Sequence, residues 1–295
     1  MKILLAGATG LVGGEVLRLL HERGLPVRTL SRDISQAQRL HDLTVDTRFV
    51  DATEPGALTG VCDGIDIVIS TLGAPVAQKA KEKRSFAAVD AVGNIALLGE
   101  AERAGVGRFI YLSACYDDST KGTAYIRAHI AVEEALRTAK LAAAFVRPTG
   151  VFGAFGELVE MAAKGPLPLI GGGDALTNPI HERDVAEALV AELTTEIRIG
   201  VPREVNVGGP ETVSRRELAL QIYRSLAKNP RLIRVPRWLI SFGAAVLRLF
   251  NRRNGEFMSF IAIASTHAAV APAVGTHRMG DYFDAIARRY SGPAA

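Results

Sequence analysis

The chain has 295 residues, of which 48% are hydrophobic and 22% are charged, and its formal net charge is +4. This length allows one sizeable core and a smaller second lobe, and the composition is that of an ordinary globular protein. The positive charge is mild, and the basic residues are spread along predicted helices instead of clustering beside aromatic residues. A nucleic-acid partner is therefore not expected.

The cysteines give little reason to expect a disulfide framework or a metal site. Cys62 and Cys115 form no CxxC pair and have no cysteine or histidine at zinc-ligand spacing. Cys115 is interpreted as a small apolar residue and not as a reactive thiol. Because Met1-Lys2 leads directly into an apolar run and not into a cleavable leader, we expect a cytoplasmic location.

The first half of the chain alternates strand and helix patterns. The expected strands are Ile3–Ala6, Val27–Leu30, Arg48–Val50, Ile65–Ile69, Phe109–Leu112 and Ala143–Val146. The expected helices are Leu11–Arg23, Ser85–Ala104 and Ala124–Ala139. Alternation of this kind predicts an α/β Rossmann fold, with a doubly wound parallel sheet that is covered by helices on both faces.

The second half follows a looser pattern. We expect a loop at 165–173, a helix at Glu182–Leu193, a strand at Glu204–Val207, and a helix to Leu226 that opens with a Ser214/Glu217 capping box. From Pro236 onward the chain reads as mostly helical. These expectations divide the chain into a Rossmann domain at 1–215, of which 151–180 contributes to the substrate lobe, and a helical substrate lobe at 216–295.

Two apolar stretches raise the question of membrane contact. Trp238–Leu247 is flanked by arginines, and Phe257–Thr276 carries no formal charge. Neither is as long and as uniformly apolar as a spanning helix requires. Packing within the substrate lobe is the favoured interpretation, and an interfacial helix that touches lipid remains the alternative.

The strongest motif is a glycine pattern between the first strand and the first helix. It consists of Gly7, Ala8, Thr9, Gly10, Leu11, Val12 and Gly13. Gly7 would permit the tight turn, Gly10 would let the backbone approach a pyrophosphate, and Gly13 would allow close packing of helix against strand. The free amides and the positive dipole end of the helix favour bound phosphate. The pattern therefore predicts a dinucleotide site.

The GxxGxxG spacing resembles that of the short-chain dehydrogenase/reductase superfamily, and especially its extended and atypical branches. The resemblance covers roughly residues 1–215, and the nearest likeness is to NmrA-like and divinyl-reductase-like proteins. It implies a nicotinamide cofactor and an oxidoreductase, or a descendant of one.

Residues after the second strand bear on the choice of cofactor. Ser31 and Arg32 stand where an NAD enzyme would place an acid for the ribose hydroxyls. A hydroxyl and a guanidinium suit a 2′-phosphate, so NADP is predicted, with NAD possible because Asp33 is close.

The resemblance also implies contacts along the rest of the cofactor. Asp51 and Ala52 would meet the adenine; the alternative is that Asp51 or Thr53 only caps the following helix. Thr71, Leu72 and Gly73 would pass under the adenine ribose. The loop of Pro148, Thr149, Gly150 and Val151 would cover the nicotinamide end.

The family's chemistry uses Ser, Tyr and Lys, with Tyr and Lys spaced as YxxxK. Here the matching residues are Ser113, Tyr125 and His129. These three are the candidate catalytic residues, and they would also contact the cofactor. Histidine at position 129 weakens the usual activation of the tyrosine, because its charge depends on pH. Farther along, His181 would either face the substrate pocket or pack at a helix start, and Asp184 would lie in the first turn of that helix.

Three functions follow as hypotheses. The favoured one is an NADPH-dependent reductase of a small apolar carbonyl, quinone or conjugated double bond, because glycines and aliphatic residues dominate the expected pocket segments Val151–Gly173 and Pro236–Phe260 and few charges are expected to converge there. The second is a non-catalytic NADP-binding redox sensor or assembly factor, which the histidine at 129 suggests. The third is a protein that acts at a lipid surface through Pro236–Phe260.

Overall fold

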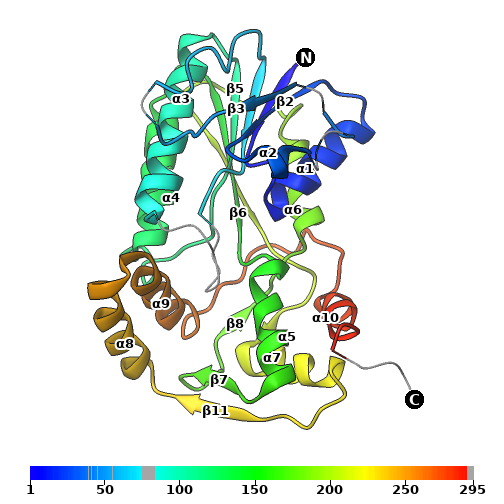
Figure 1. Ribbon diagram of the computed structural model, residues 1–295, viewed down its shortest axis with the longest axis vertical. Coiled ribbons are helices and arrows are strands. Elements are labelled where there is room, and N and C mark those ends of the chain that lie inside the picture. Colours follow the sequence, from blue (N-terminus) through cyan, green and yellow to red (C-terminus); the bar gives the residue numbers. More distant parts are fainter. Residues whose placement is uncertain (39, 41, 45, 55, 75–83, 291–295) are drawn as a thin grey trace.

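A seven-stranded parallel sheet forms the centre of the molecule (Figure 1). The structure is a computed structural model, and it describes residues 1–290 apart from 39, 41, 45, 55 and 75–83. Its strand order is β3-β2-β1-β4-β5-β6-β9. The strands are β1 (Ile3–Ala6), β2 (Val27–Ser31), β3 (Asp46–Phe49), β4 (Ile67–Ser70), β5 (Arg108–Leu112), β6 (Ala142–Pro148) and β9 (Arg203–Val207). The predicted Rossmann architecture is confirmed. The order reverses direction beside β1, where such sheets bind ligands at the carboxyl ends of the strands.

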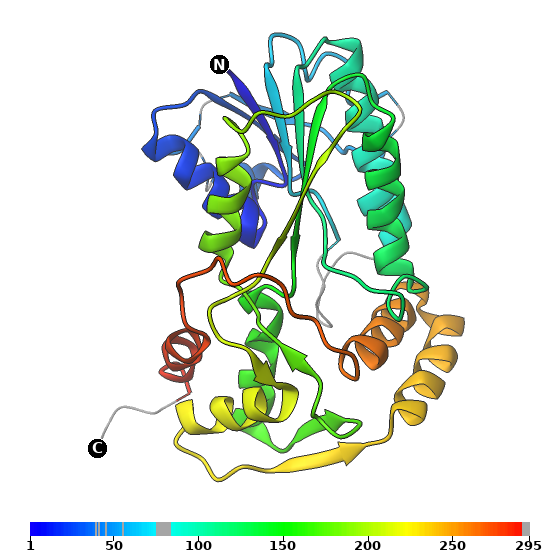
Figure 2. The same cartoon turned by 180° about the vertical axis from the view of Figure 1, so that it is seen from behind.

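Helices cover both faces of this sheet. On one face lie α1 (Leu11–Glu22) and α6 (Glu182–Ala191), and on the other lie α3 (Gly93–Arg103) and α4 (Ala124–Arg137), as Figures 1 and 2 show. The short helix α2 (Ile34–Gln38) follows β2. Alternate residues of β1 enter two separate cores: Ile3 and Leu5 pack with α1 and α6, whereas Leu4 and Ala6 pack on the other side. Burial on both faces explains why β1 is continuously apolar, whereas the edge strands β3 and β9 contain charged residues and are partly exposed.

The long helix expected at Ser85–Ala104 is divided. A π-helical turn, η1 (Ala87–Val92), precedes α3. Such turns are rare and are frequent at functional sites. Here the turn contains the buried Asp90, which lies near the end of β4.

The smaller lobe has its own apolar core. The 3₁₀ turn η2 (Phe152–Phe155) and the helices α5 (Gly156–Lys164), α7 (Arg215–Ser225) and α10 (Met279–Ala287) share this core. The predicted capping box between Ser214 and Glu217 is present at the start of α7. The lobe boundary at 215–216 stays a prediction.

Two small ribbons complete this lobe. The strand β8 (Leu176–Thr177) pairs antiparallel with β10 (Val213–Ser214), and β7 (Leu167–Ile170) pairs parallel with β11 (Leu232–Val235). The loop prediction for 165–173 is therefore wrong at β7. Leu167 and Leu169 are buried while Pro168 is exposed, so the segment has the alternation of a strand.

The last part of the chain is helical only in places. The helices α8 (Arg237–Phe250) and α9 (Arg252–Ala264) form a hairpin, and the chain then returns in an irregular stretch in which Ala269 bridges to Thr177 and Ala273 to Gly208. The packing expected for Trp238–Leu247 is only partly observed, because Ala244 is the one buried residue of α8. Among the described residues, no helix combines the length and the apolar character needed to cross a bilayer.

Candidate functional site

The glycine turn after β1 leaves no room for side chains. Gly7 has a φ of +83°, and a Cβ atom there would lie 2.6 Å from the carbonyl oxygen of Thr71. A Cβ atom at Gly13 would collide with the carbonyl oxygen of Gly7. Both positions therefore require glycine, one for its backbone conformation and one for the close approach of α1 to the turn.

The N-terminus of α1 is open. Gly10 is its N-cap and provides no side-chain hydrogen bond, while Thr9, Gly10 and Leu11 are exposed. The amides of the first helical turn have no partners inside the helix, and they point along its positive dipole end. This geometry fits a phosphate group, so the residues present suit the pyrophosphate of a dinucleotide.

Two arginines meet one carboxylate near the ends of β2 and β3. Arg84 Nη1 lies 2.9 Å from Asp51 Oδ2, and Arg32 Nη1 lies 3.7 Å from the same oxygen. The other carboxylate oxygen, Oδ1, accepts hydrogen bonds from the backbone amide and the hydroxyl of Thr53. Asp51 thus organises its own turn and also holds two cations. Arg32 is a predicted cofactor residue, whereas Arg84 is not, because its place beside Asp51 depends on long-range folding.

Two neighbouring predicted cofactor residues, Ser31 and Ala52, have contacts within the protein. Ser31 Oγ donates to the carbonyl oxygen of Asp33 at 2.9 Å, and Ala52 is buried in the core. A surface pocket of about 280 Å³ lies beside Ala52 and Thr53 and reaches Val92 and Ala96. Its lining includes Ala52, one of the two residues predicted to meet the adenine.

The loop after β4 is held by hydrogen bonds from the π-helical turn and from the first turn of α3. Asp90 Oδ2 accepts a hydrogen bond from the amide of Ala74 at 2.9 Å, and Asn94 Nδ2 donates to the carbonyl oxygen of Leu72 at 3.0 Å. Thr71 donates to the carbonyl oxygen of Ala6 through both its amide and its hydroxyl. The predicted ribose-binding segment is thus fixed against the glycine turn.

The loop after β6 is tied to the segment that precedes α6. The hydroxyl of Thr149 donates to the carbonyl oxygen of Asn178 at 2.7 Å, and the amide of Ile180 donates to the carbonyl oxygen of Gly150 at 2.8 Å. Val151 bridges to Ile180, and Pro148 ends β6. The backbone of this loop is therefore well ordered where it was predicted to cover nicotinamide.

The structure brings Tyr125 and His129 together on α4. Their ring centroids are 4.7 Å apart in an edge-to-face arrangement, and Phe86 and Phe260 pack on the tyrosine at 5.2 and 4.8 Å. Phe260 comes from α9, so the α8–α9 hairpin closes over Tyr125. The phenol consequently lies in an aromatic environment.

His129 does not occupy the role of a lysine. Its Nδ1 is hydrogen bonded to the hydroxyl of Tyr111 at 2.7 Å, and its Nε2 lies 3.9 Å from Asp90 Oδ1. Burial lowers the pKa of His129 to about 4, an effect that the Glu133 carboxylate only partly offsets. The imidazole is therefore neutral at physiological pH. Burial and the nearby Asp90 raise the pKa of Tyr125 above its ordinary value, so its phenol stays protonated.

Ser113 belongs to a different hydrogen-bond network. Its hydroxyl donates to Glu133 Oε1 at 2.6 Å, and the same oxygen accepts from Arg147 Nε at 2.7 Å. Arg147 also pairs with Glu204, and the hydroxyl of Tyr116 donates to Glu133 Oε2. Burial would raise the pKa of Glu133, but the bonds from Arg147 and Ser113 outweigh it and hold that pKa below its usual value. Glu133 and Arg147 were not found as site residues from the sequence.

The segment around α6 carries a second cluster of polar side chains. His181 caps the helix by accepting at Nδ1 from the amide of Arg183 at 3.0 Å, and its ring stacks on His277 at 4.4 Å. His277 Nδ1 lies 2.7 Å from the buried carboxylate of Asp184. Asp184 also accepts from the amide of Thr276, so it anchors the returning chain. The helix-start role considered for His181 is therefore observed.

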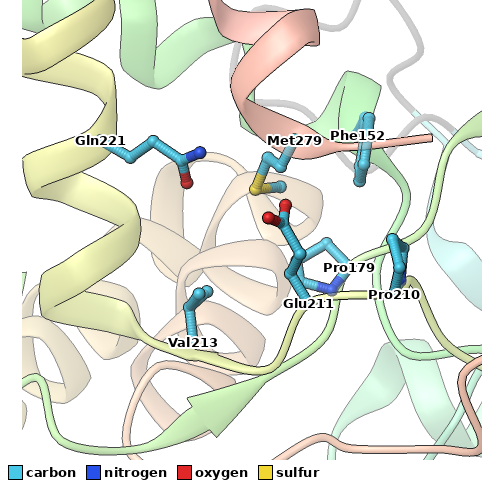
Figure 3. Close-up of a pocket in the computed structure, with 7 residues that line it drawn as sticks. All are labelled: Phe152, Pro179, Pro210, Glu211, Val213, Gln221 and Met279. Carbon is cyan, nitrogen blue, oxygen red and sulfur yellow. The ribbon is translucent and has the colours of Figure 1, made fainter. Parts of the chain in front are cut away.

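A separate small cavity lies in the smaller lobe (Figure 3) and has room for about one water molecule. It is lined by Phe152, Pro179, Pro210, Glu211, Val213, Gln221 and Met279. None of these residues belongs to the predicted cofactor or catalytic set.

Comparison with known proteins gives the family. The model of the family described as NAD(P)H-binding matches residues 7–196. Subunit 9 of the NADH dehydrogenase (ubiquinone) 1 alpha subcomplex of Arabidopsis thaliana mitochondria is 29% identical over 243 residues, and the match covers 78% of this chain and 59% of that subunit. A ceramide reductase of Caulobacter vibrioides is 28% identical over 238 residues, covering 79% and 73% of the two chains.

Among solved structures, an NADPH-dependent quinone oxidoreductase of Escherichia coli in complex with NADPH superposes with a TM-score of 0.76 at 18% identity. The match covers 96% of this chain and 99% of that one, and it shows the fold. The predicted nicotinamide cofactor, NADP with NAD possible, agrees with these matches. The family match and the open glycine turn lead to one conclusion: the chain belongs to the NAD(P)H-binding family, within the short-chain dehydrogenase/reductase superfamily that its sequence resembles.

Proposed function

We propose that this protein is an NADP(H)-dependent oxidoreductase that reduces a small apolar carbonyl, quinone or conjugated double bond. The observation that carries the proposal is the glycine turn, in which Gly7 and Gly13 allow no side chain and the first amides of α1 are left open. The names of the ceramide reductase and the quinone oxidoreductase support an apolar acceptor.

The cofactor would lie along the carboxyl edge of the sheet. The amides of Leu11 to Gly13 would hold the pyrophosphate, and Asp51 and Ala52 would meet the adenine. Arg32 and Arg84 would bind the 2′-phosphate, because a guanidinium pairs well with phosphate oxygens. When bound, NADPH would supply a hydride at the nicotinamide end, near the 148–151 loop and Tyr125.

Tyr125 would act as a neutral hydrogen-bond donor to the acceptor oxygen. Its phenol remains protonated, and the neutral His129 supplies no positive charge to stabilise a tyrosinate. Reduction adds one hydride and one proton to the acceptor; Tyr125 would only hydrogen bond to the acceptor oxygen, and the proton would come from water. The rings of Phe86 and Phe260 around Tyr125 favour an apolar acceptor over a charged one.

The direct test is fluorescence-monitored binding of NADPH, followed by its oxidation in the presence of a panel of quinones and enones. We expect NADPH to bind more tightly than NADH and to be oxidised by at least one apolar acceptor. Absence of affinity for both coenzymes would contradict the proposal. Binding without oxidation by any acceptor would contradict the reductase activity alone.

A non-catalytic redox sensor is the second candidate. It is favoured by the engagement of His129 with Tyr111, which leaves the lysine position without a cation. The variant His129→Lys separates the two hypotheses, since Asp90 is close enough to pair with an ammonium group. If NADPH oxidation appears or rises in this variant, the protein is a weakened enzyme. If the variant binds NADPH but still does not oxidise it, the protein is a sensor.

A further inference from the structure

Helix α8 presents a stripe of large apolar side chains to the outside of the molecule. Trp238, Phe242, Leu249 and Phe250 are 69%, 64%, 81% and 84% exposed, and Val246 between them is 41% exposed. Their spacing of three to four residues places them on one side of the helix. Isolated exposed apolar residues are ordinary, but a continuous stripe of this kind marks a contact surface.

Packing between α8 and α9 keeps the stripe on the outside of the molecule. The opposite side of α8 packs on α9, where a Cβ atom at Gly255 would lie 2.7 Å from the carbonyl oxygen of Ala244. This close approach fixes the rotation of α8 about its own axis. α9 in turn rests on Tyr125 through Phe260. The orientation of the stripe is therefore set by the core.

The surroundings of the stripe are strongly basic. Between Glu217 and Glu256 the sequence contains seven arginines, one lysine and no acidic residue. Arg253 is buried over the ring of Phe86 and Arg252 pairs with Glu256, but Arg237 and Arg248 flank the stripe and are exposed. Arg231 and Arg234 lie exposed on and beside β11, which joins α8 along the lower edge of the molecule in Figure 1.

We propose that α8 lies flat on the surface of an anionic lipid bilayer. Tryptophan, phenylalanine and leucine would enter the boundary between headgroups and acyl chains, and the arginines would contact the anionic headgroups. A second copy of the chain fits less well, because a two-fold contact through this face would bring like charges together. The inference stands apart from the proposed reductase activity, since it concerns a different face of the protein.

Trp238 is the sole tryptophan of the chain, so its fluorescence reports directly on this face. We expect its emission to shift to shorter wavelength on addition of phosphatidylcholine vesicles that contain about 30% phosphatidylglycerol, and to be quenched by brominated lipids. Pure phosphatidylcholine should give a much smaller shift, and added salt should reverse part of the binding.

Two variants sharpen the test. Phe242→Ser should lower the vesicle partition coefficient by about tenfold or more, because a phenyl ring is lost from the buried stripe. Arg237→Glu should lower it by roughly tenfold on anionic vesicles only. Ile199→Ser is the matched control, since Ile199 is 64% exposed on another part of the chain, and it should change nothing.

The proposal is overturned if anionic vesicles leave Trp238 emission unchanged, or if Phe242→Ser and Ile199→Ser behave alike. It is also overturned if light scattering shows a dimer in which Trp238 is already shielded without lipid. That result would identify a second copy as the occupant of this face.

Discussion

A Cβ atom at Gly13 would collide with the carbonyl oxygen of Gly7, so the two glycines are coupled across the turn that opens α1. We expect Gly13→Ala to push α1 away from β1 and to weaken NADPH binding by at least about tenfold, with a loss of about 1–3 kcal/mol of unfolding free energy. Calorimetric titration with NADPH and urea unfolding measure the two effects.

Gly14→Ala is the control for this prediction. Its Cβ atom would lie 3.7 Å from the carbonyl oxygen of Ala8, which is an ordinary contact, and the helix would gain up to ~1 kcal/mol. NADPH affinity should stay unchanged. Equal affinities of the two variants for NADPH would show that the turn does not bind the cofactor as proposed.

The contact of Arg32 and Arg84 with Asp51 suggests a test of coenzyme preference. Replacing either arginine with alanine should weaken NADPH binding by about ten- to a hundredfold, because a charge-assisted contact with the 2′-phosphate is lost. NADH binding should change little. Arg48→Ala is the control, since Arg48 is on the neighbouring strand and pairs with Asp46 instead. Parallel losses for both coenzymes would place these arginines outside the phosphate site.

Local patterns predicted most of this fold correctly. The glycine turn was predicted from the GxxGxxG spacing and the sheet from short apolar runs. Both signals lie within a few consecutive residues and do not depend on contacts between distant parts of the chain. β7 was missed because its alternating Leu167 and Leu169 are interrupted by prolines, and its partner β11 lies far along the chain. Likewise, nothing in the sequence around α8 showed which of its sides α9 would cover.

The candidate site was harder to predict, because its partners come from distant elements. Tyr125 and His129 are one helical turn apart, so their proximity followed from spacing alone. The attachment of Ser113 to Glu133 and Arg147 joins the residue that follows β5 to α4 and β6. The pairing of Arg84 with Asp51 joins residues that are 33 positions apart. Contacts of this kind depend on tertiary packing, which periodicity does not encode.

The buried carboxylate of Glu133 gives a stability prediction. Glu133→Gln should lower the unfolding free energy by about 3 kcal/mol, because Arg147 loses its buried partner. Glu134→Gln, at the exposed neighbouring position, should cost less than about 0.5 kcal/mol.

The pH dependence of Glu133 follows from its lowered pKa. Its contribution is complete above the ordinary glutamate pKa and is lost as the pH falls through the lower, folded-state value. Urea unfolding at a series of pH values from neutral to acidic measures this loss of unfolding free energy. The Glu133→Gln variant should lack the part of the pH dependence that Glu133 causes. A slope shared by both proteins would assign the acid sensitivity to other groups.

The neutral imidazole of His129 predicts a second pH dependence. Burial lowers its pKa from 6.5 to about 4, so between these values the unfolded chain binds a proton that the folded chain does not. The contribution of His129 to stability is therefore complete above pH 6.5 and is lost as the pH falls toward 4, by roughly 3 kcal/mol in all. His129→Phe should remove this dependence of the unfolding free energy on pH, whereas His21→Gln, at an exposed position, should leave it unchanged. Proton-detected NMR titration of the histidine rings measures the pKa of His129 directly. A value near or above 6.5 would contradict the neutral imidazole and would show that the ring can carry a positive charge.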